Sequence, residues 1–575
     1  QRRYGEADHL VAEAREIREH VAPGNPLTAD IVFFQGSVAE AQGRTREAER
    51  LWKQAIAMAE RMEDELPLSE HELSRFGARF YLYYQTVATH LATNGRGEEA
   101  FALIERARAR ALRSMLLGAR AVPAGVPPRL WFEYRRVLHR IERLRSKVAQ
   151  RAGGGRNAVD EPGLEGEMAP LVQRRDQLVR RIVAAAPRLA GLGNLPSPSA
   201  EDIRRGLDPG TVLLSYIAGQ DETVLLALTS SGPAATLRTF TIPAGSAELK
   251  RRIDILRAFI ARGRLSPIAD DALLAQGRKL FRLLVAPALE EIEPARRLLI
   301  IPDGPLREAP FAAFVLPGER PRFLGTWKPL FFDPSAGAFL ALRARRGRHG
   351  GGGGVIAFGD PVYPGESEVV KALDLRPLEG SRSEVRRIAA RFEGKARVFL
   401  GNDASEERLR SLPGGARYLH LAVHAQPDAR FPLESALFLS LPARPGAPSD
   451  RDGVLHAWEI MDAVRLPARV VTLSGCSTAG GERVPGEGVL GLARAFQYAG
   501  ASTVVASQWP VADRSACELM DRFYAGLAQG LDTAEALRAA RAALAAAPLP
   551  LARGKFMDAR HPFHWAAFQV IGDWR

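Results

Sequence analysis

Hydrophobic residues recur with a helical period over roughly the first 200 positions and gather into short runs after that. The apolar positions of Phe101–Leu117 follow the period of a helix, and those of Val137–Val148 are spaced by four, three and four residues, as in a short heptad seam. The runs Thr211–Tyr216 and Thr223–Leu228 have the length and composition of paired antiparallel strands. The pattern therefore predicts a helical region followed by an α/β region.

Small residues recur at fixed spacings within the helical region. Spacings of 12 and then 7 residues separate the members of two sets, which are Gly36, Ala48, Ala55 and Ala88, Ala100, Ala107. Gly43 and Gly95 stand where turns between helices are expected. Repeats of the tetratricopeptide (TPR) type need small residues where their helices approach closely. We expect degenerate TPR-like repeats over residues 1–117, with a concave surface that docks a partner or an upstream sensor. A plain helical bundle without a binding role is the alternative.

A basic helical hairpin is expected over residues 118–199, broken by Gly153–Gly155. Residues 128–190 carry fourteen Lys or Arg against seven acidic residues, which accounts for much of the net charge of +13. No RNP signature, zinc-finger spacing or Walker loop accompanies this charge. We therefore favour a solvated basic surface, and nucleic-acid contact through phosphate charge is the alternative.

An Arg- and Gly-rich linker at 343–354 divides the α/β region into residues 200–342 and 355–575. Apolar runs and helical patterns alternate in the second part, which predicts a mostly parallel, doubly wound sheet. Two of its expected strands end at reactive side chains: Leu419–His424 at a His, and Val470–Leu473 just before Cys476. Ligands of open α/β sheets bind at the carboxyl edge, where these two side chains would meet. A thiol beside an imidazole suffices for nucleophilic acyl transfer.

Several motifs in this region occur in the order found in one known family. They are Ile300–Leu306, Gly380–Val385, Cys476–Gly480, Gly488–Phe496, Ala499–Asp513 and His561–Phe568. Over roughly residues 200–575 the chain resembles the CHAT domain, the caspase-like domain found with TPR repeats, mostly in bacteria. The resemblance implies TPR-like repeats followed by an α/β caspase-like fold, with a pseudo-caspase half at 200–342 and a catalytic half at 355–575. His424 precedes Cys476 by 52 residues, close to the roughly 50 residues of caspases.

The family's activity implies a regulated cysteine endopeptidase of clan CD that cuts a protein substrate. Cys476 would attack the scissile carbonyl, and His424 would protonate the departing amine. The backbone N–H groups of Ala425 and Cys476 would form the oxyanion hole, although the family usually has Gly where this chain has Ala425. A catalytically silent scaffold that acts by binding is the alternative. We expect His420, four residues before His424, to be a hydrogen-bonded core residue.

Substrate specificity is expected to depend on an acidic residue. Asp513 lies in a segment that resembles the one in separase where an acid receives a substrate Arg. A desolvated carboxylate pairs bidentately with Arg and less well with Lys, so cleavage after Arg, or else Lys, is expected. Asp513 also stands where it could cap a helix that starts near Arg514. Asp428 and Glu434 are further candidates for substrate binding.

Composition narrows the remaining possibilities. The sequence contains no run of 18 or more apolar residues, so a membrane-spanning helix is not expected. The two Cys exclude a disulfide scaffold and fit a reducing cytoplasm. Without a tight cluster of His and carboxylates, neither a metal nor another cofactor is expected. The chain starts at Gln1 rather than Met, so we expect a fragment or a processed product.

Overall fold

The structure is a computed structural model of the 575-residue chain. It describes residues 4–21, 26–65, 70–119, 130, 133–134, 136–137, 140, 170–171, 173–174, 177–178, 181, 198–230, 237–264, 271–344, 353–412, 416–428, 434–441, 452–466, 468–475, 486–511, 513–546, 549–550, 556–557 and 559–575. The chain forms two compact units, one of Gln1–Val87 with Arg110–Ser197 and one of Ala88–Ala109 with Pro198–Arg575. The predicted hairpin over 118–199 lies almost entirely outside the described residues.

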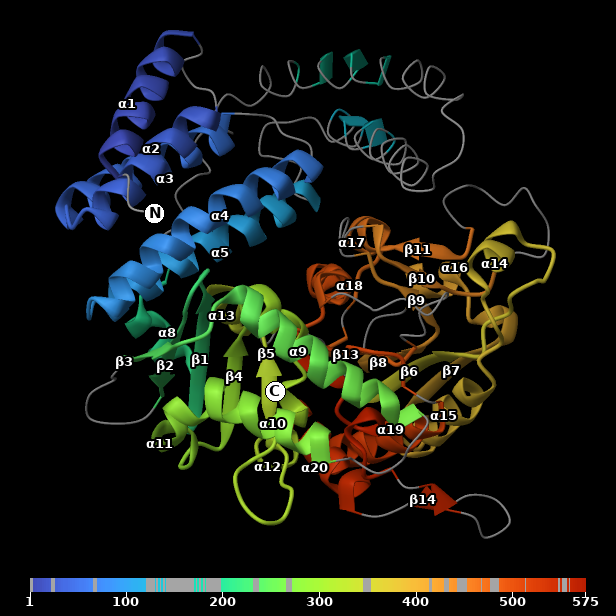
Figure 1. The fold of residues 1–575 in the computed structure, drawn as a ribbon. Coiled ribbons are helices and arrows are strands. Elements are labelled where there is room, and N and C mark those ends of the chain that lie inside the picture. Colours follow the sequence, from blue (N-terminus) through green and yellow to red (C-terminus); the bar gives the residue numbers. More distant parts are fainter. Residues whose placement is uncertain are drawn as a thin grey trace. The chain divides into compact units, whose positions relative to one another are not determined.

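The described part of the first unit is helical (Figure 1). Its helices are α1 (Tyr4–Val21), α2 (Pro26–Ala41), α3 (Thr45–Glu65) and α4 (Glu70–Thr93) up to Val87. A turn at Gly43, whose φ of 77° favours glycine, joins α2 to α3. A Cβ on Gly36 would lie 2.6 Å from Cδ1 of Trp52, and Ala48 and Ala55 are fully buried. The small residues therefore stand where these two helices touch, as the repeat pattern predicts.

Residues Ala88–Ala109 belong to the second unit and repeat this arrangement with the end of α4 and most of α5 (Gly97–Ala119). The turn between them contains Gly95, with a φ of 79°. On α5, the buried Arg108 pairs with the buried Glu105 at 3.0 Å and donates a 2.8 Å hydrogen bond to Oγ of Ser215. Arg108 also donates to the carbonyl oxygen of Tyr216. These bonds attach α5 to the β-sheet of the unit.

Eleven of the described strands form one sheet, in the order β3-β2-β1-β4-β5-β16-β13-β12-β8-β6-β7. The five of the first half are β1 (Thr211–Ala218), β2 (Thr223–Thr229), β3 (Leu237–Ile242), β4 (Arg297–Ile301) and β5 (Leu330–Phe332). The six of the second half are β6 (Gly354–Gly359), β7 (Ala396–Leu400), β8 (Ala416–Ala422), β12 (Val470–Leu473), β13 (Thr503–Ser507) and β16 (Phe568–Gly572). β1 and β12 are buried along their whole length, as strands covered on both faces must be.

The two halves differ in strand direction and meet at one strand. β1 and β2 are antiparallel, as predicted, whereas β1 and β4 are parallel. In the second half β7, β6, β8, β12 and β13 are all parallel. β16 runs antiparallel to β13 and pairs with β5 through Ile571 and Phe332, which joins the halves. Helical repeats followed by an α/β region with two halves confirm the predicted fold class.

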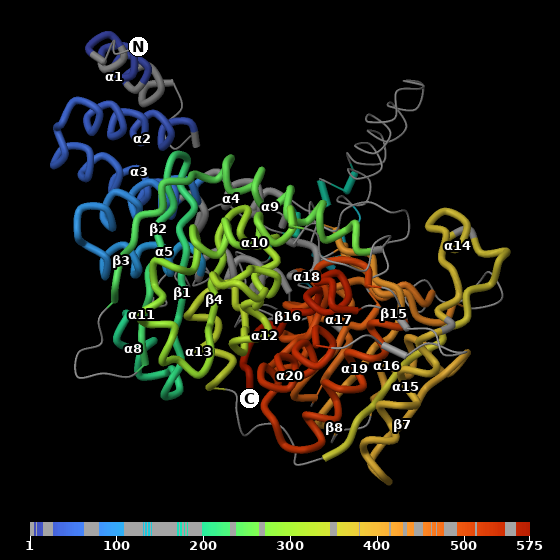
Figure 2. Tube along the Cα trace, turned by 60° about the horizontal axis from the view of Figure 1, so that its bottom comes forward, coloured from blue at the N-terminus to red at the C-terminus, as the bar shows by residue number. Residues whose placement is uncertain are grey.

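Helices cover both faces of this sheet. Those of the first half are α8 (Ala200–Gly206), α9 (Ser246–Ala261), α10 (Asp271–Leu284), α11 (Leu289–Ile292), α12 (Leu324–Trp327) and α13 (Ala336–Ala344). Those of the second half are α14 (Glu368–Leu373), α15 (Glu379–Ala390), α16 (Glu406–Arg410), α17 (Ala457–Ala463), α18 (Gly486–Ala499), α19 (Asp513–Ala528) and α20 (Thr533–Ala546). α15 and α19 pack together on one side of the second half, and α18 lies on the other (Figure 1). Figure 2 shows the first half, in green, directly beside the second half, in yellow to red, and α12 of the first half packs against α20 of the second.

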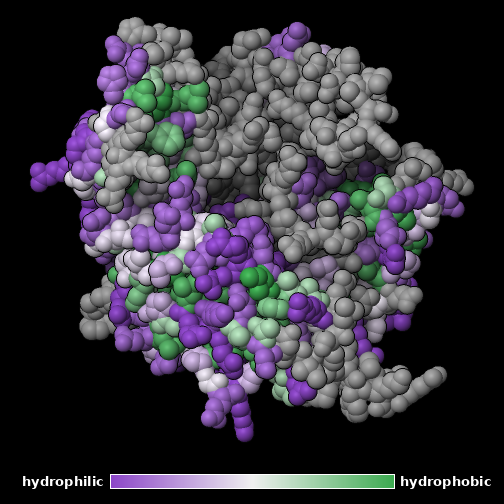
Figure 3. All heavy atoms as spheres, viewed as in Figure 1, coloured by the Kyte–Doolittle hydropathy of each residue, from purple (hydrophilic) through white to green (hydrophobic). Residues whose placement is uncertain are grey.

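Two small sheets accompany the large one. β9 (His424–Gln426), β10 (Ala436–Phe438) and β11 (Val454–His456) form an antiparallel sheet, and β14 (Leu549–Pro550) pairs with β15 (Phe556–Met557). On the face shown in Figure 3, hydrophilic side chains predominate over α9 and α10, with small separate hydrophobic patches. Among the described residues of the second unit, the exposed large apolar side chains are Ile255, Val362, Val398 and Leu531.

Candidate functional site

The site is built where the neighbouring parallel strands β8 and β12 end. His420 of β8 pairs with Thr472 of β12 in the ladder, and the N–H of Ser474 donates a 2.9 Å hydrogen bond to the carbonyl of Leu421. One residue further, Gly475 lies so close to Val423 that an ideal Cβ would fall 1.7 Å from the Val423 carbonyl oxygen. Only glycine fits there. The two segments that lead to His424 and Cys476 therefore run against each other.

His424 does not continue β8, which corrects the predicted strand Leu419–His424. β8 ends at Ala422, and His424 begins β9, where it pairs with Phe438 of β10. Val423, against which Gly475 lies, forms the bend between β8 and β9, where the chain leaves the large sheet. The imidazole is thereby placed on a separate small sheet at the carboxyl edge of the large one.

His424 is buried, with 5% of the residue exposed, and two groups contact its imidazole. Its Nε2 lies 2.7 Å from the carbonyl oxygen of Arg376. Because a carbonyl only accepts, Nε2 carries the proton in this bond, and Nδ1 is the nitrogen with a lone pair in the neutral ring. The ring of Tyr363 lies 5.4 Å from the imidazole centroid, and its hydroxyl donates a 2.8 Å bond to the carbonyl of Phe438. Burial raises the pKa of this hydroxyl, so it stays protonated as a donor.

The Arg376 carbonyl is positioned by the residues before it. Asp374 ends α14 in the left-handed conformation, with a φ of 47°. Leu375 then packs into an apolar cluster with Ala436, Phe438 and Leu441 beneath the small sheet. Phe438, a member of this cluster, is the cross-strand partner of His424. The same apolar cluster therefore supports both His424 and the segment that carries the Arg376 carbonyl.

A cleft opens beside Gly475, between the carboxyl ends of the strands and the helices α15 and α19. Its lining includes three serines, a carboxylate and two small residues, which are Ser381, Ser474, Ser507, Glu384, Gly475 and Ala516. Glu384 is 4% exposed, and its Oε1 lies 2.8 Å from Nε2 of the fully buried His420. The structure thus confirms His420 as a hydrogen-bonded core residue. Glu384 belongs to the Gly380–Val385 motif, which sequence reasoning used to find the family without giving this residue a role.

The other predicted site residues lie elsewhere or cannot be described. Cys476 and its N–H fall outside the described residues, and so does the side chain of Asp513, although α19 begins at that residue. Ala425 is buried in β9 opposite Leu437. Their predicted roles therefore stay predictions.

Asp428 and Glu434 stand at the far end of the β9–β10 hairpin from His424. The N–H of Asp428 donates a 2.9 Å bond to Ser435, and the Glu434 carboxylate lies 3.7 Å from Nδ1 of His456. Neither residue is among the described residues that line the cleft. Their part in substrate binding also stays a prediction.

Neither a metal-ligand cluster nor a membrane-spanning helix occurs among the described residues. No group of three or more His, Cys, Asp or Glu side chains within the described ranges could hold a metal ion. In the same part of the chain, no helix combines the length and the hydrophobicity that crossing a membrane requires.

Comparison with known proteins assigns the family. The model of the CHAT domain matches residues 274–573, more than half of the chain. The chain therefore belongs to the CHAT-domain family, as its motifs predicted.

Curated relatives are tetratricopeptide repeat proteins. Tetratricopeptide repeat protein 28 of Homo sapiens is 35% identical over 119 residues, which are 21% of this chain and 4% of that protein. Its counterpart in Mus musculus is 34% identical over 125 residues, or 22% of this chain and 5% of that protein. The chain thus matches only a small part of either relative's length.

Among solved structures, two crystal structures of the Saccharomyces cerevisiae separase–securin complex are similar. Each shares 10% sequence identity with this chain and aligns with 95% of it. The alignments cover 49% and 50% of the respective separase-complex chains, with TM-scores of 0.38 and 0.39.

Proposed function

We propose that this chain is a cysteine endopeptidase in which Cys476 is the nucleophile and His424 its proton donor and acceptor. The observation that carries the proposal is the contact between Gly475 and Val423. Each of these residues is bonded to one member of the dyad, and consecutive Cα atoms are only 3.8 Å apart. Membership of the CHAT-domain family supports the same assignment.

In this mechanism the Cys476 thiolate attacks the scissile carbonyl carbon and forms a C–S bond. The C–N bond then breaks as His424 gives a proton to the departing amine, which leaves a thioester. Water, losing a proton to His424, cleaves the thioester and releases the thiolate and a carboxylic acid, which gives its proton to the solvent. The Arg376 carbonyl holds the proton on Nε2 of His424, so that Nδ1 is the nitrogen that exchanges protons with the reactants.

The remaining parts of the proposal concern the substrate. The backbone N–H groups of Ala425 and Cys476 would stabilise the tetrahedral oxyanion. Cleavage would follow Arg, or else Lys, with an acidic residue in the substrate site; Asp513, Asp428 and Glu434 are the candidates from the sequence. The TPR-like helices would dock a protein substrate or an activating partner.

A scaffold without activity is the second candidate, and Ala425 favours it. The family usually has Gly after the His, and the Ala425 methyl, in a residue only 2% exposed, narrows the space beside the oxyanion. Such a chain would bind protein partners through the same surfaces.

The test is hydrolysis of fluorogenic peptides that end in Arg, Lys or Asp, with Cys476→Ala as the control. Cleavage after Arg that the control lacks is the expected result. Cleavage after Asp would keep the dyad and overturn the specificity. If no peptide is cut, labelling of Cys476 by a peptidyl acyloxymethyl ketone separates a latent enzyme, which is labelled, from a scaffold, which is not.

A further inference from the structure

The carboxylate of Glu384 lines the cleft beside Gly475 and is almost completely buried, with 4% of the residue exposed. Its hydrogen bond in the described structure is the one with His420. No Lys or Arg of the described residues forms an ion pair with it. A buried carboxylate without a cationic partner is costly, and here the charge borders a cleft.

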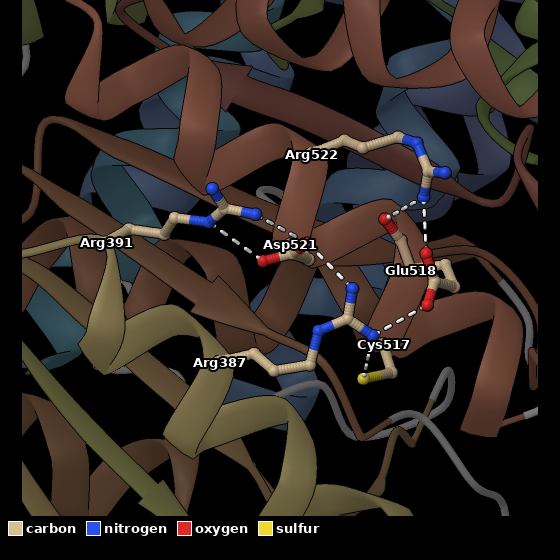
Figure 4. Close-up of polar contacts among 6 residues, drawn as sticks. All are labelled: Arg387, Arg391, Cys517, Glu518, Asp521 and Arg522. Carbon is tan, nitrogen blue, oxygen red and sulfur yellow. Dashed lines mark hydrogen bonds and ion pairs between the residues drawn. The ribbon is translucent and has the colours of Figure 1, made fainter.

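Arg387, three positions after Glu384 on α15, is bound to groups of α19. Arg387 donates hydrogen bonds to Glu518 at 2.6 Å and to Asp521 at 2.7 Å, and it lies 3.6 Å from Sγ of Cys517 (Figure 4). Arg391 also binds Asp521. Figure 4 shows both arginines reaching from α15 toward the acidic side chains of α19. Arg387 therefore pairs with the carboxylates of Glu518 and Asp521 on α19.

His420 is the hydrogen-bond partner of Glu384. Its ring is fully buried, and Nδ1 has no hydrogen-bond partner. A protonated ring would bury an Nδ1–H without an acceptor, whereas the neutral ring with its proton on Nε2 leaves only a lone pair unpaired. With no acceptor for Nδ1 among the described residues, Nε2 of His420 is the nitrogen that donates to Glu384.

A second polar atom in the cleft also lacks a partner. Oγ of Ser474 is buried and makes no hydrogen bond with any of the described residues. By contrast, the neighbouring Ser381 is satisfied, because its hydroxyl donates to the carbonyl of Leu378 and accepts from the N–H of Asp360. Ser474 precedes Gly475 directly on the strand that leads to Cys476.

We propose that the cleft between α15, α19 and the end of β12 receives the basic side chain of the residue after which the substrate is cut, and that Glu384 is the carboxylate that binds it. The Ser474 hydroxyl accepts a further hydrogen bond from the same group. A guanidinium suits this site best, because it brings several fixed N–H donors and remains charged when buried. The inference rests on the proposed function, and it assigns the principal carboxylate to Glu384 rather than to Asp513.

Binding of benzamidine, an aromatic amidinium ion, tests the inference without requiring hydrolysis. The protein is the full chain with Cys476→Ala, alone or combined with Glu384→Gln, and calorimetry or ligand-observed NMR measures the Kd. Because a hydrogen bond to a charged group contributes about 1.5–3 kcal/mol, Glu384→Gln should weaken binding about 10- to 100-fold. Glu518→Gln is the matched control: it removes a carboxylate on α19 that binds Arg387 and is not among the lining residues, so it should leave the Kd unchanged.

The outcomes separate the inference from the proposed function. The inference is overturned if the Cys476→Ala chain binds benzamidine equally with and without Glu384→Gln, or if neither chain binds it. It is also overturned if Asp513→Asn abolishes benzamidine binding while Glu384→Gln does not. Peptide hydrolysis tests the proposed function separately, because benzamidine binding does not depend on Cys476. In an active chain, Glu384→Gln should lower kcat/KM for an Arg peptide but not for its norleucine analogue.

A variant at a buried position can fail to fold, so two further changes keep the inference testable. Glu384→Asp retains the charge and should retain benzamidine binding within about 10-fold. Ser474→Ala removes a hydroxyl that has no partner within the described part of the chain, and it should weaken binding by about 3- to 10-fold. Unchanged binding by Ser474→Ala would remove that residue from the site. Circular dichroism establishes that each variant is folded.

Discussion

Gly475 and Val423 are in backbone contact, so close that a Cβ on Gly475 would lie 1.7 Å from the Val423 carbonyl oxygen. The two residues belong to chain segments more than 50 positions apart, and each stands directly before one member of the proposed dyad. The distance between the reactive side chains thus depends on a position that admits no side chain.

Replacement of Gly475 by Ala should disturb both stability and activity. The added methyl group forces the backbone apart, which should lower the free energy of unfolding by about 2 kcal/mol or more. A displacement near 1 Å between reacting groups should reduce kcat/KM by about 100-fold. Thermal unfolding and peptide hydrolysis measure these effects. Gly365→Ala is the control, because a Cβ there would meet nothing within 4 Å; equal behaviour of the two variants would contradict the prediction.

Tyr363 should contribute to activity through its ring more than through its hydroxyl. Tyr363→Phe loses the bond to the Phe438 carbonyl and should cost about 1 kcal/mol of stability with little change in kcat. Tyr363→Ala removes the ring beside His424 and should lower kcat by about 10-fold or more, with KM nearly constant. Tyr216→Phe loses a comparable buried bond in the first half, to the carbonyl of Leu284, and controls for stability alone. An unchanged kcat in Tyr363→Ala would show that Tyr363 does not position His424.

Glu459 should make stability fall as the pH rises toward neutrality. Burial raises the pKa of its carboxyl from 4.5 to about 7, and burial also raises the pKa of Glu406, which shares Arg410 with it. Between pH 4.5 and about pH 7, Glu459 holds more protons in the native chain than in the unfolded chain, so the free energy of unfolding declines as the pH rises.

The measurement compares the wild type with Glu459→Gln in urea from pH 5 to pH 8. Relative to the wild type, the variant should gain up to about 3 kcal/mol across this range. Glu407→Gln changes an exposed carboxyl of the same region and should show no such trend. A constant difference between wild type and Glu459→Gln would mean that this carboxyl does not titrate in the range.

Arg108 should be among the most important side chains for the stability of the second unit. Arg108→Met leaves the buried Glu105 without its cation and removes the bonds to β1, which should cost about 3–5 kcal/mol. The half-exposed pair of Arg96 and Glu99 lies at the start of α5, with Arg96 directly before the helix, and Arg96→Met should cost less than about 1 kcal/mol. Chemical unfolding of both variants, followed by far-ultraviolet circular dichroism, tests the contrast. Similar losses would show that the Arg108 pair contributes no more than a surface pair.

Local patterns in the sequence predicted the features that depend on neighbouring residues. The turns at Gly43 and Gly95, the paired strands β1 and β2, and the parallel neighbours β8 and β12 all follow from apolar periods and glycine positions. Contacts between distant segments carry no such signal. The bond from His424 to the Arg376 carbonyl involves a backbone group, which every residue has. The pairing of Glu384 with His420 brings a helix and a strand together across 36 positions.

The attachment of α5 to β1 has a consequence for exchanging the repeats between relatives. Residues Ala88–Ala109 belong to the same compact unit as the sheet, and the guanidinium of Arg108 satisfies groups on Ser215 and Tyr216. A chimera joined after residue 117 would import a foreign helix at this position and leave those groups unmatched. A junction near Val87 would keep the native α5 together with its hydrogen bonds to β1.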